Sequence, residues 1–89
     1  MEKELTDAIR NRWVVRLKYA PGDRIIEPHA LGVSADNNLL LRAYQTEGVS
    51  NSGEQVNWKL FRVDRIQDLE ITREGFTGTG LATIRMTQR

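Results

Sequence analysis

The fold class is decided by the stretch Trp13-Val-Val-Arg-Leu-Lys-Tyr-Ala-Pro-Gly-Asp-Arg24. Its apolar side chains recur at every second position, with Val15, Leu17 and Tyr19 on one side and charged residues between them. This period of two is typical of a strand with one buried face. The Pro-Gly-Asp sequence that follows favours a tight turn. The stretch therefore predicts the first strand of an antiparallel hairpin.

A short helix is predicted before this strand, over residues 4–12. Leu5, Ala8 and Ile9 have the spacing of one helix face. Acidic residues come early in the segment and Arg10 and Arg12 come late, as the helix dipole favours.

Four further strands are predicted after the turn, at residues 24–31, 39–44, 56–63 and 69–72. The first contains Pro28, which cannot donate a ladder hydrogen bond and suggests a strand end, an edge or a bend. Residues 46–53 are rich in Ser, Gly and Asn and predict a loop. One helix and five short strands indicate a mainly β protein, which we expect to close into a small five-stranded β-barrel without exposed edges.

The length and composition restrict the function. The chain has 89 residues, which suits a single domain, and we place this domain at residues 1–73. For the remaining tail, residues 74–89, a strand, an interface segment and disorder all stay open. The chain has no cysteine and a single histidine, so thiolate clusters and paired-histidine metal sites are excluded. We expect no metal and no cofactor.

No segment of the sequence is suited to a membrane. The longest apolar run is Leu39-Leu-Leu41, far below the roughly 18 residues that span a bilayer. The amino terminus is acidic and polar and does not resemble a targeting signal. We expect a cytoplasmic protein without a membrane partner.

The basic residues are unevenly placed. Thirteen Lys and Arg face twelve Asp and Glu, a formal charge of +1, which argues against coating nucleic acid by bulk charge. Five basic residues nevertheless lie between residues 10 and 24 beside a single acid, Asp23, and Lys59, Arg62 and Arg65 form a second set. Such side chains suit phosphate, although solvated strand faces are their more common role.

Four segments, in this order, carry a resemblance to a known family. They are Val15-Arg-Leu-Lys-Tyr19, Arg24-Ile-Ile-Glu-Pro-His-Ala-Leu31, Leu39-Leu-Leu-Arg-Ala-Tyr44 and Trp58-Lys-Leu-Phe-Arg-Val-Asp-Arg-Ile66. Over residues 4–72 the chain resembles a stand-alone WYL domain of bacterial or phage type. It departs from the family where the Trp-Tyr-Leu name-motif is Leu39-Leu-Leu41, so two aromatic rings are replaced.

The resemblance implies an Sm-like or SH3-like barrel that senses a ligand in transcription regulation. The ligand would be a nucleotide or a short single-stranded nucleic acid. Regulators with this domain usually carry a DNA-binding domain, for which 89 residues leave no room. We therefore expect a solitary sensor that works with a DNA-binding regulator or by self-association.

Six residues are candidate ligand contacts under this resemblance: Arg24, His29, Tyr44, Lys59, Arg62 and Arg65. The arginines and His29 would bind phosphate, and Tyr44 would stack on a base. An ion pair with Asp64 is an equal alternative for Arg65, and a core position is an equal alternative for Tyr44. Trp13, Tyr19 and Trp58 are predicted to fill the core.

Catalysis is not expected. The sequence has no Gly-x-Ser-x-Gly elbow, no Walker-type loop and no second histidine. Glu27 and Asp64 are better explained by salt bridges with neighbouring arginines than by a carboxylate pair. The alternative function is a protein-interaction or oligomerisation module that binds no nucleic acid. In that module the sheet edge, the Leu triplet or residues 81–86 would dock another subunit.

Overall fold

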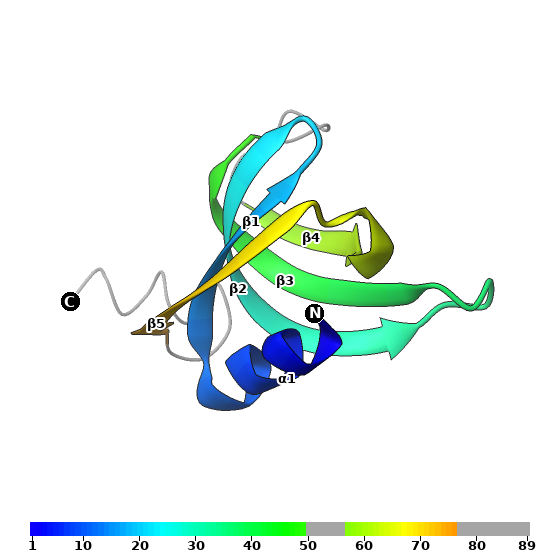
Figure 1. The fold of residues 1–89 in the computed structure, drawn as a ribbon, viewed down its shortest axis with the longest axis horizontal. Helices are drawn as coiled ribbons and strands as arrows, with labels where there is room; N and C mark the ends of the chain where they lie inside the picture. Colours follow the sequence, from blue (N-terminus) through cyan, green and yellow to red (C-terminus); the bar gives the residue numbers. More distant parts are fainter. Residues whose placement is uncertain (50–56, 77–89) are drawn as a thin grey trace.

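The structure is a computed structural model, which describes residues 1–49 and 57–76. The described chain begins with a helix, which is followed by the strands of a sheet (Figure 1). The elements are α1 (Glu2–Asn11), β1 (Trp13–Tyr19), β2 (Gly22–Val33), β3 (Leu39–Gly48), β4 (Asn57–Arg62), the 3₁₀ helix η1 (Val63–Arg65) and β5 (Asp68–Gly75). The strands form one antiparallel sheet in the order β4-β3-β2-β1-β5. The prediction of a mainly β fold with one amino-terminal helix is confirmed.

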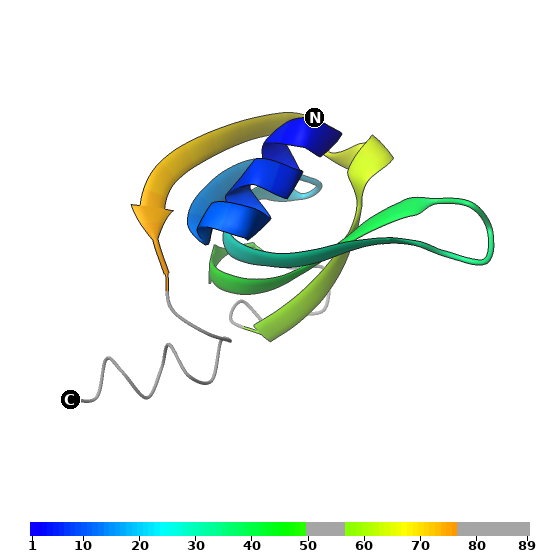
Figure 2. The ribbon, with the colours of Figure 1, turned by 90° about the horizontal axis from the view of Figure 1, so that it is seen from below.

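The expected barrel closure is wrong. The sheet is strongly curved, but β4 and β5 remain its two edges, and no ladder joins them within residues 1–49 and 57–76. The chain passes from β4 through η1 directly into β5, which pairs with β1 on the far side of the sheet. Helix α1 lies across one opening of the curved sheet instead (Figure 2). The helix thereby covers apolar surface that a closed barrel would bury between strands.

Helix α1 packs through the face that its spacing predicts. Leu5 and Ala8 are fully buried, and Ile9 packs against the same core. The helix ends at Arg12, whose φ of 55° is left-handed and turns the chain into β1. Most of the remaining core cluster comes from the strands, with Val15, Leu17, Ile26, Leu41 and Phe61 among them, and Val63 of η1 and Ile66 complete it.

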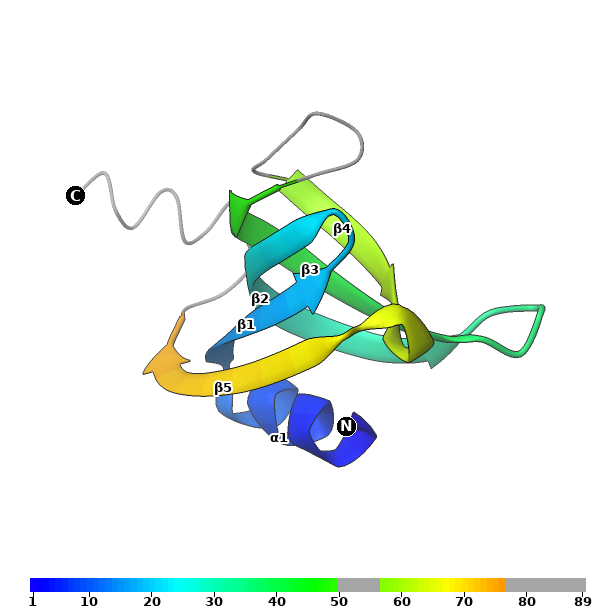
Figure 3. The same ribbon diagram turned by 45° about the horizontal axis from the view of Figure 1, so that its top comes forward.

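The hairpin predicted at residues 13–24 is confirmed. Tyr19 pairs with Gly22 and Lys18 with Asp23, so β1 and β2 are joined by a two-residue turn. The second hairpin, between β2 and β3, turns at residues 34–38 and extends away from the body of the fold (Figure 3).

Strand β2 contains the most informative irregularity of the sheet. Pro28 pairs with Ala43 and Ala30 with Arg42, so His29 is an extra residue without a partner in the ladder. Pro28 is fully buried within this twelve-residue strand, so of the predicted roles it takes the bend. A bulge of this kind redirects side chains locally, and here the redirected side chain is that of His29.

Of the predicted boundaries, the ends of β3 and β5 differ most from the structure. The loop predicted from residue 46 begins later, because residues 46–48 continue β3 and pair with the start of β2. The Thr46 hydroxyl donates a hydrogen bond to the Ile25 carbonyl at 3.3 Å. The rest of that loop except Val49, the expected strand start at Val56 and most of the tail, from residue 77, lie outside the described residues. At the other end of the sheet β5 runs to Gly75.

Candidate ligand-binding face

The side chain of Trp58 is the centre of an aromatic cluster on the outer face of the sheet. Trp58 pairs with Tyr44 across β4 and β3, and their ring centroids are 5.4 Å apart. The His29 ring lies 4.8 Å from the Trp58 ring on another side. The Arg42 guanidinium carbon lies 5.0 Å from the centre of the indole, within cation–π distance. We call His29, Arg42, Tyr44, Trp58 and Phe76 the Trp58 cluster.

The bulge in β2 places His29 in this cluster. Its ring also lies 5.3 Å from the ring of Phe76, which follows β5. The Nε2 atom of His29 is buried and has no hydrogen-bond partner among the described residues. Burial lowers the pKa of His29, and the positive charges of Arg12 and Arg42 lower it further. The imidazole is therefore held neutral, with one polar atom unsatisfied.

Open grooves run along the face beside Trp58. One of about 270 Å³ is lined by Arg42, Trp58, Lys59 and Leu60. A second of about 220 Å³ shares Arg42 and Leu60 with the first and continues past Leu40 to the end of β2. Leu60 is 62% exposed and Val33 is 65% exposed. The two grooves form a continuous surface that is apolar at its base and carries cations at its rim.

Arg42 is the cation most available for a ligand on this face. It is exposed, and no ion pair or hydrogen bond of its guanidinium is found among the described residues. Its contact with the indole leaves its N–H groups available for an anion. Lys59 lines the same groove.

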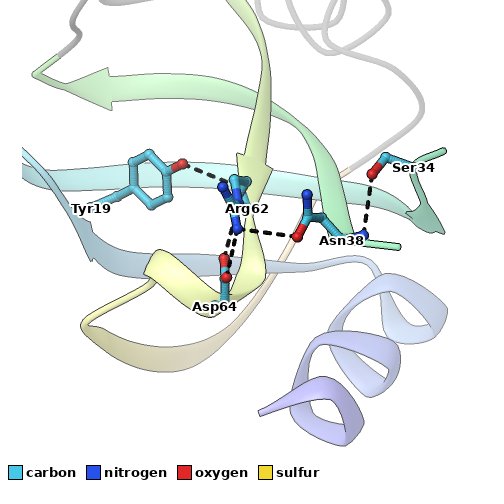
Figure 4. Close-up of polar contacts among 5 residues, drawn as sticks. All are labelled: Tyr19, Ser34, Asn38, Arg62 and Asp64. Atoms are coloured by element: carbon cyan, nitrogen blue, oxygen red, sulfur yellow. Dashed lines mark hydrogen bonds and ion pairs between the residues drawn. The ribbon is translucent and has the colours of Figure 1, made fainter. Parts of the chain in front are cut away.

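Arg62, by contrast, is bound to the protein itself (Figure 4). Its guanidinium holds both carboxylate oxygens of Asp64, at 3.2 and 2.9 Å, and the Asn38 side-chain oxygen at 3.1 Å. Its backbone N–H donates to the Tyr19 hydroxyl at 3.2 Å. The Asn38 backbone N–H donates to Ser34 Oγ, so Arg62 connects β4 and η1 to the second hairpin.

Arg24 is an interior residue, 4% exposed. Its guanidinium donates to the carbonyls of Tyr19 and Ala20, at 3.2 and 2.8 Å, and lies 3.5 Å from Gln45 Oε1. The guanidinium also lies beside the rings of Tyr19 and Phe61, 5.1 and 5.4 Å from their centres, and these two rings contact each other. Burial lowers the pKa of Arg24, while the neighbouring Tyr19 raises it.

Arg65 lies in a separate pocket of about 410 Å³ between the first hairpin turn and η1. The pocket is lined by Tyr19, Ala20, Asp64, Arg65, Ile66 and Gln67. Arg65 is exposed, and Asp64 binds Arg62 rather than Arg65. Of the two alternatives for Arg65, the ion pair with Asp64 is therefore not formed.

The structure brings only part of the predicted site together. His29 and Tyr44 lie on the outer face with Trp58. Lys59 borders the first groove, but it pairs with the buried Ala43, so it alternates to the opposite face of β4 from Trp58. Arg62 and Arg65 lie at the η1 end of β4, and Arg24 is interior. Sequence reasoning missed Arg42 and assigned Trp58 to the core, although alternation places both beside Tyr44. Nothing in the sequence indicates Phe76.

The basic run near the amino terminus is balanced across the sheet. Lys18 pairs with Asp23 on β2 and Asp68 on β5, and Arg16 pairs with Glu70. Arg16 and Glu70 approach to 3.9 Å. Part of the charge excess of residues 10–24 is therefore met by Asp68 and Glu70 of β5, which are distant in sequence.

A family model identifies the family to which this chain belongs. The WYL domain model matches residues 2–71, most of the chain. The chain belongs to the WYL domain family. Comparison with curated proteins and with solved structures found no match.

Membership of the WYL family is consistent with a regulatory, ligand-sensing domain, and WYL domains are generally not enzymes. Within the part of this WYL domain that the structure describes, no helix is long and apolar enough to span a bilayer. The same residues contain no group of three or more His, Asp or Glu side chains suited to a metal ion.

Proposed function

We propose that this WYL domain is a non-catalytic sensor that binds a nucleotide-containing ligand or a short single-stranded nucleic acid on its outer face. The observation that carries the proposal is the Trp58 cluster, which combines an indole, a neutral imidazole and an available guanidinium beside an open groove. Proteins that bind single strands combine aromatic rings for bases with cations for phosphates in this way.

Bases would stack on Trp58 and on the neighbouring ring of His29, and Tyr44 would support the indole. Trp58 is half-buried at the edge strand, while Tyr44 is only 7% exposed. The base-stacking role predicted for Tyr44 therefore passes in this proposal to Trp58, with Tyr44 holding the indole edge-on.

Phosphate contacts would come from Arg42 and Lys59, which line the groove beside the indole. Arg65 stays a proposed phosphate contact in its own pocket. Arg24 and Arg62, predicted as phosphate contacts, already satisfy their donors within the protein. We assign them the role of holding Tyr19 and η1 in place.

The wider setting is proposed from the family. The domain would act in the cytoplasm of a bacterium and pass its occupancy to a DNA-binding regulator or to a second copy. The similarity to Sm-like or SH3-like barrels remains a prediction, because the sheet is open between its edge strands β4 and β5.

The direct test is a titration of a fluorescein-labelled ten-nucleotide single strand, followed by anisotropy at two salt concentrations. Trp58→Leu is expected to weaken binding about 5- to 150-fold, since stacking on one ring contributes about 1 to 3 kcal/mol. Trp13→Leu is the matched control, because Trp13 packs against the core and not in the Trp58 cluster. Absence of binding, or an affinity that does not depend on the salt concentration, would contradict the proposal.

A protein-interaction role is the second candidate, favoured by the exposure of Leu60 and Val33 along the second groove. In this case the wild-type protein sediments as a dimer and Leu60→Glu as a monomer. A wild-type monomer at all concentrations excludes self-association through this surface.

A further inference from the structure

Phe76 has an unusual position for a residue that follows the last strand. It is only 8% exposed, and its backbone N–H donates to the Arg12 carbonyl at 2.9 Å. Its ring lies against His29, which belongs to β2, although the chain has just left β5 at the edge of the sheet. Phe76 therefore connects the end of β5 to His29 of β2, although β1 separates these two strands in the sheet.

The end of β5 is shaped to place this ring. The β1–β5 register changes between Val15↔Ile71 and Trp13↔Gly75, so three residues of β5 oppose one residue of β1. Thr72 Oγ1 donates to the Val14 carbonyl at 2.7 Å and accepts the Glu74 N–H at 3.1 Å.

Arg73, within this bulge, has a φ of 62°. A left-handed conformation costs energy in a residue other than glycine, and it persists where the surroundings fix it. The bulge bends the strand and directs Phe76 back over Arg12.

The ring of Phe76 lies beside a polar group that it cannot satisfy. Nε2 of His29 is buried without a hydrogen-bond partner among the described residues, an arrangement that costs free energy. A nucleobase against the same imidazole would offer both a flat ring and hydrogen-bonding edges. The side chain in place is therefore a poorer partner for His29 than the proposed ligand would be.

We propose that Phe76 is a built-in competitor for the base of the ligand. Its ring takes the position against His29 that a base would occupy, and ligand binding displaces it. Displacement breaks the contacts of Phe76 with His29 and Arg12 and changes the direction in which the chain leaves β5. This inference rests on the proposed function, and it assigns the end of β5 as the place where occupancy of the face is transmitted.

The first experiment compares wild type, Phe76→Ala and Leu69→Ala in the same single-strand titration. Removing the competitor is expected to tighten binding roughly tenfold, because the face is then permanently in its competent state. Leu69→Ala is the matched control, since Leu69 lies on the same strand and packs against the core rather than His29. If wild type binds and Phe76→Ala binds equally or more weakly, the competitor role is overturned while the proposed function stands. If neither protein binds, the proposed function fails and the competitor role fails with it.

The second experiment uses the wild-type protein, so it does not depend on the folding of a variant. The chain has one histidine and two phenylalanines, which makes the nuclear Overhauser contact between the His29 and Phe76 rings easy to assign. We expect this contact to disappear when the protein is saturated with the ten-nucleotide strand. Persistence of the contact at saturation overturns the competitor role.

Discussion

The two ends of β4 place arginines against aromatic rings in different ways. At the Trp58 end, Arg42 lies over an indole and keeps its hydrogen-bond donors available. At the Arg62 end, the guanidinium of Arg62 is held by Asp64 and Asn38, and Arg24 beneath it donates to two carbonyls. The same residue type binds the protein where acceptors lie within reach and stays available where they do not.

This difference separates arginines that stabilise the fold from arginines that are available to bind a ligand. The arginines at the Arg62 end join the first hairpin, η1 and the second hairpin, so their removal should affect folding first. At the Trp58 end the guanidinium of Arg42 lies over the indole and lines the groove, so its removal should affect binding first. Three experiments test this separation.

The largest effect is expected for Arg24→Met. The substitution leaves the carbonyls of Tyr19 and Ala20 without their donor inside the protein, and it should lower the free energy of unfolding by about 3 kcal/mol. Urea denaturation measures the change. Arg16→Met is the control, because its pair with Glu70 is exposed and should contribute less than about 0.5 kcal/mol. Equal losses in both variants would show that Arg24 is not a support residue.

An intermediate effect is expected from Arg42→Gln in the salt dependence of binding. One phosphate contact to a single strand contributes about 0.7 to the slope of log K against log salt. Arg42→Gln should therefore lower this slope by about 0.7, whereas Arg62→Gln should leave the slope unchanged and lower the melting temperature. The reverse pattern would place the phosphate contact at the Arg62 end.

The smallest effect is expected from pH. The pKa of His29 is lowered in the folded protein, so the unfolded chain binds the proton more readily. Stability is then complete above the usual histidine pKa of about 6.5 and falls as the pH drops below it. The free energy of unfolding should change with pH by well under the single-proton limit of about 1.4 kcal/mol per pH unit, because the imidazole is only partly buried. Thermal melts of wild type and His29→Phe at several pH values measure this loss of stability. An identical loss in acid for both proteins would contradict the role of His29.

Much of the fold could be predicted from the sequence because its signals are local. Alternation in residues 13–19 and the Pro-Gly-Asp turn specify the first hairpin, and the spacing of Leu5 and Ala8 specifies the helix. Closure of the sheet could not be predicted in this way. It depends on whether β4 and β5 meet, which is a relation between distant segments rather than a property of either one.

The site was predictable only in part for the same reason. The resemblance identified His29, which the structure places with Tyr44 against Trp58 on the outer face. It could not distinguish Arg62 from Arg42, because the partners of Arg62 include Asn38, twenty-four residues away. Phe76 reaches His29 only through the bulge in β5, and bulges have no reliable sequence signal.

The bulge in β2 contains one residue more than the pairing of β2 with β3 needs at this point. If His29 were deleted, Pro28 opposite Ala43 and Ala30 opposite Arg42 would already be in regular register. This part of the ladder would then run without interruption, while the second register shift, between Ile25 and Ile26, would remain. The pairing of the two strands therefore does not require His29. Loss of one codon would simplify the strand and remove the only imidazole. The extra residue therefore adds nothing to the pairing of β2 with β3, and its effect is confined to the side chain that it adds to the outer face.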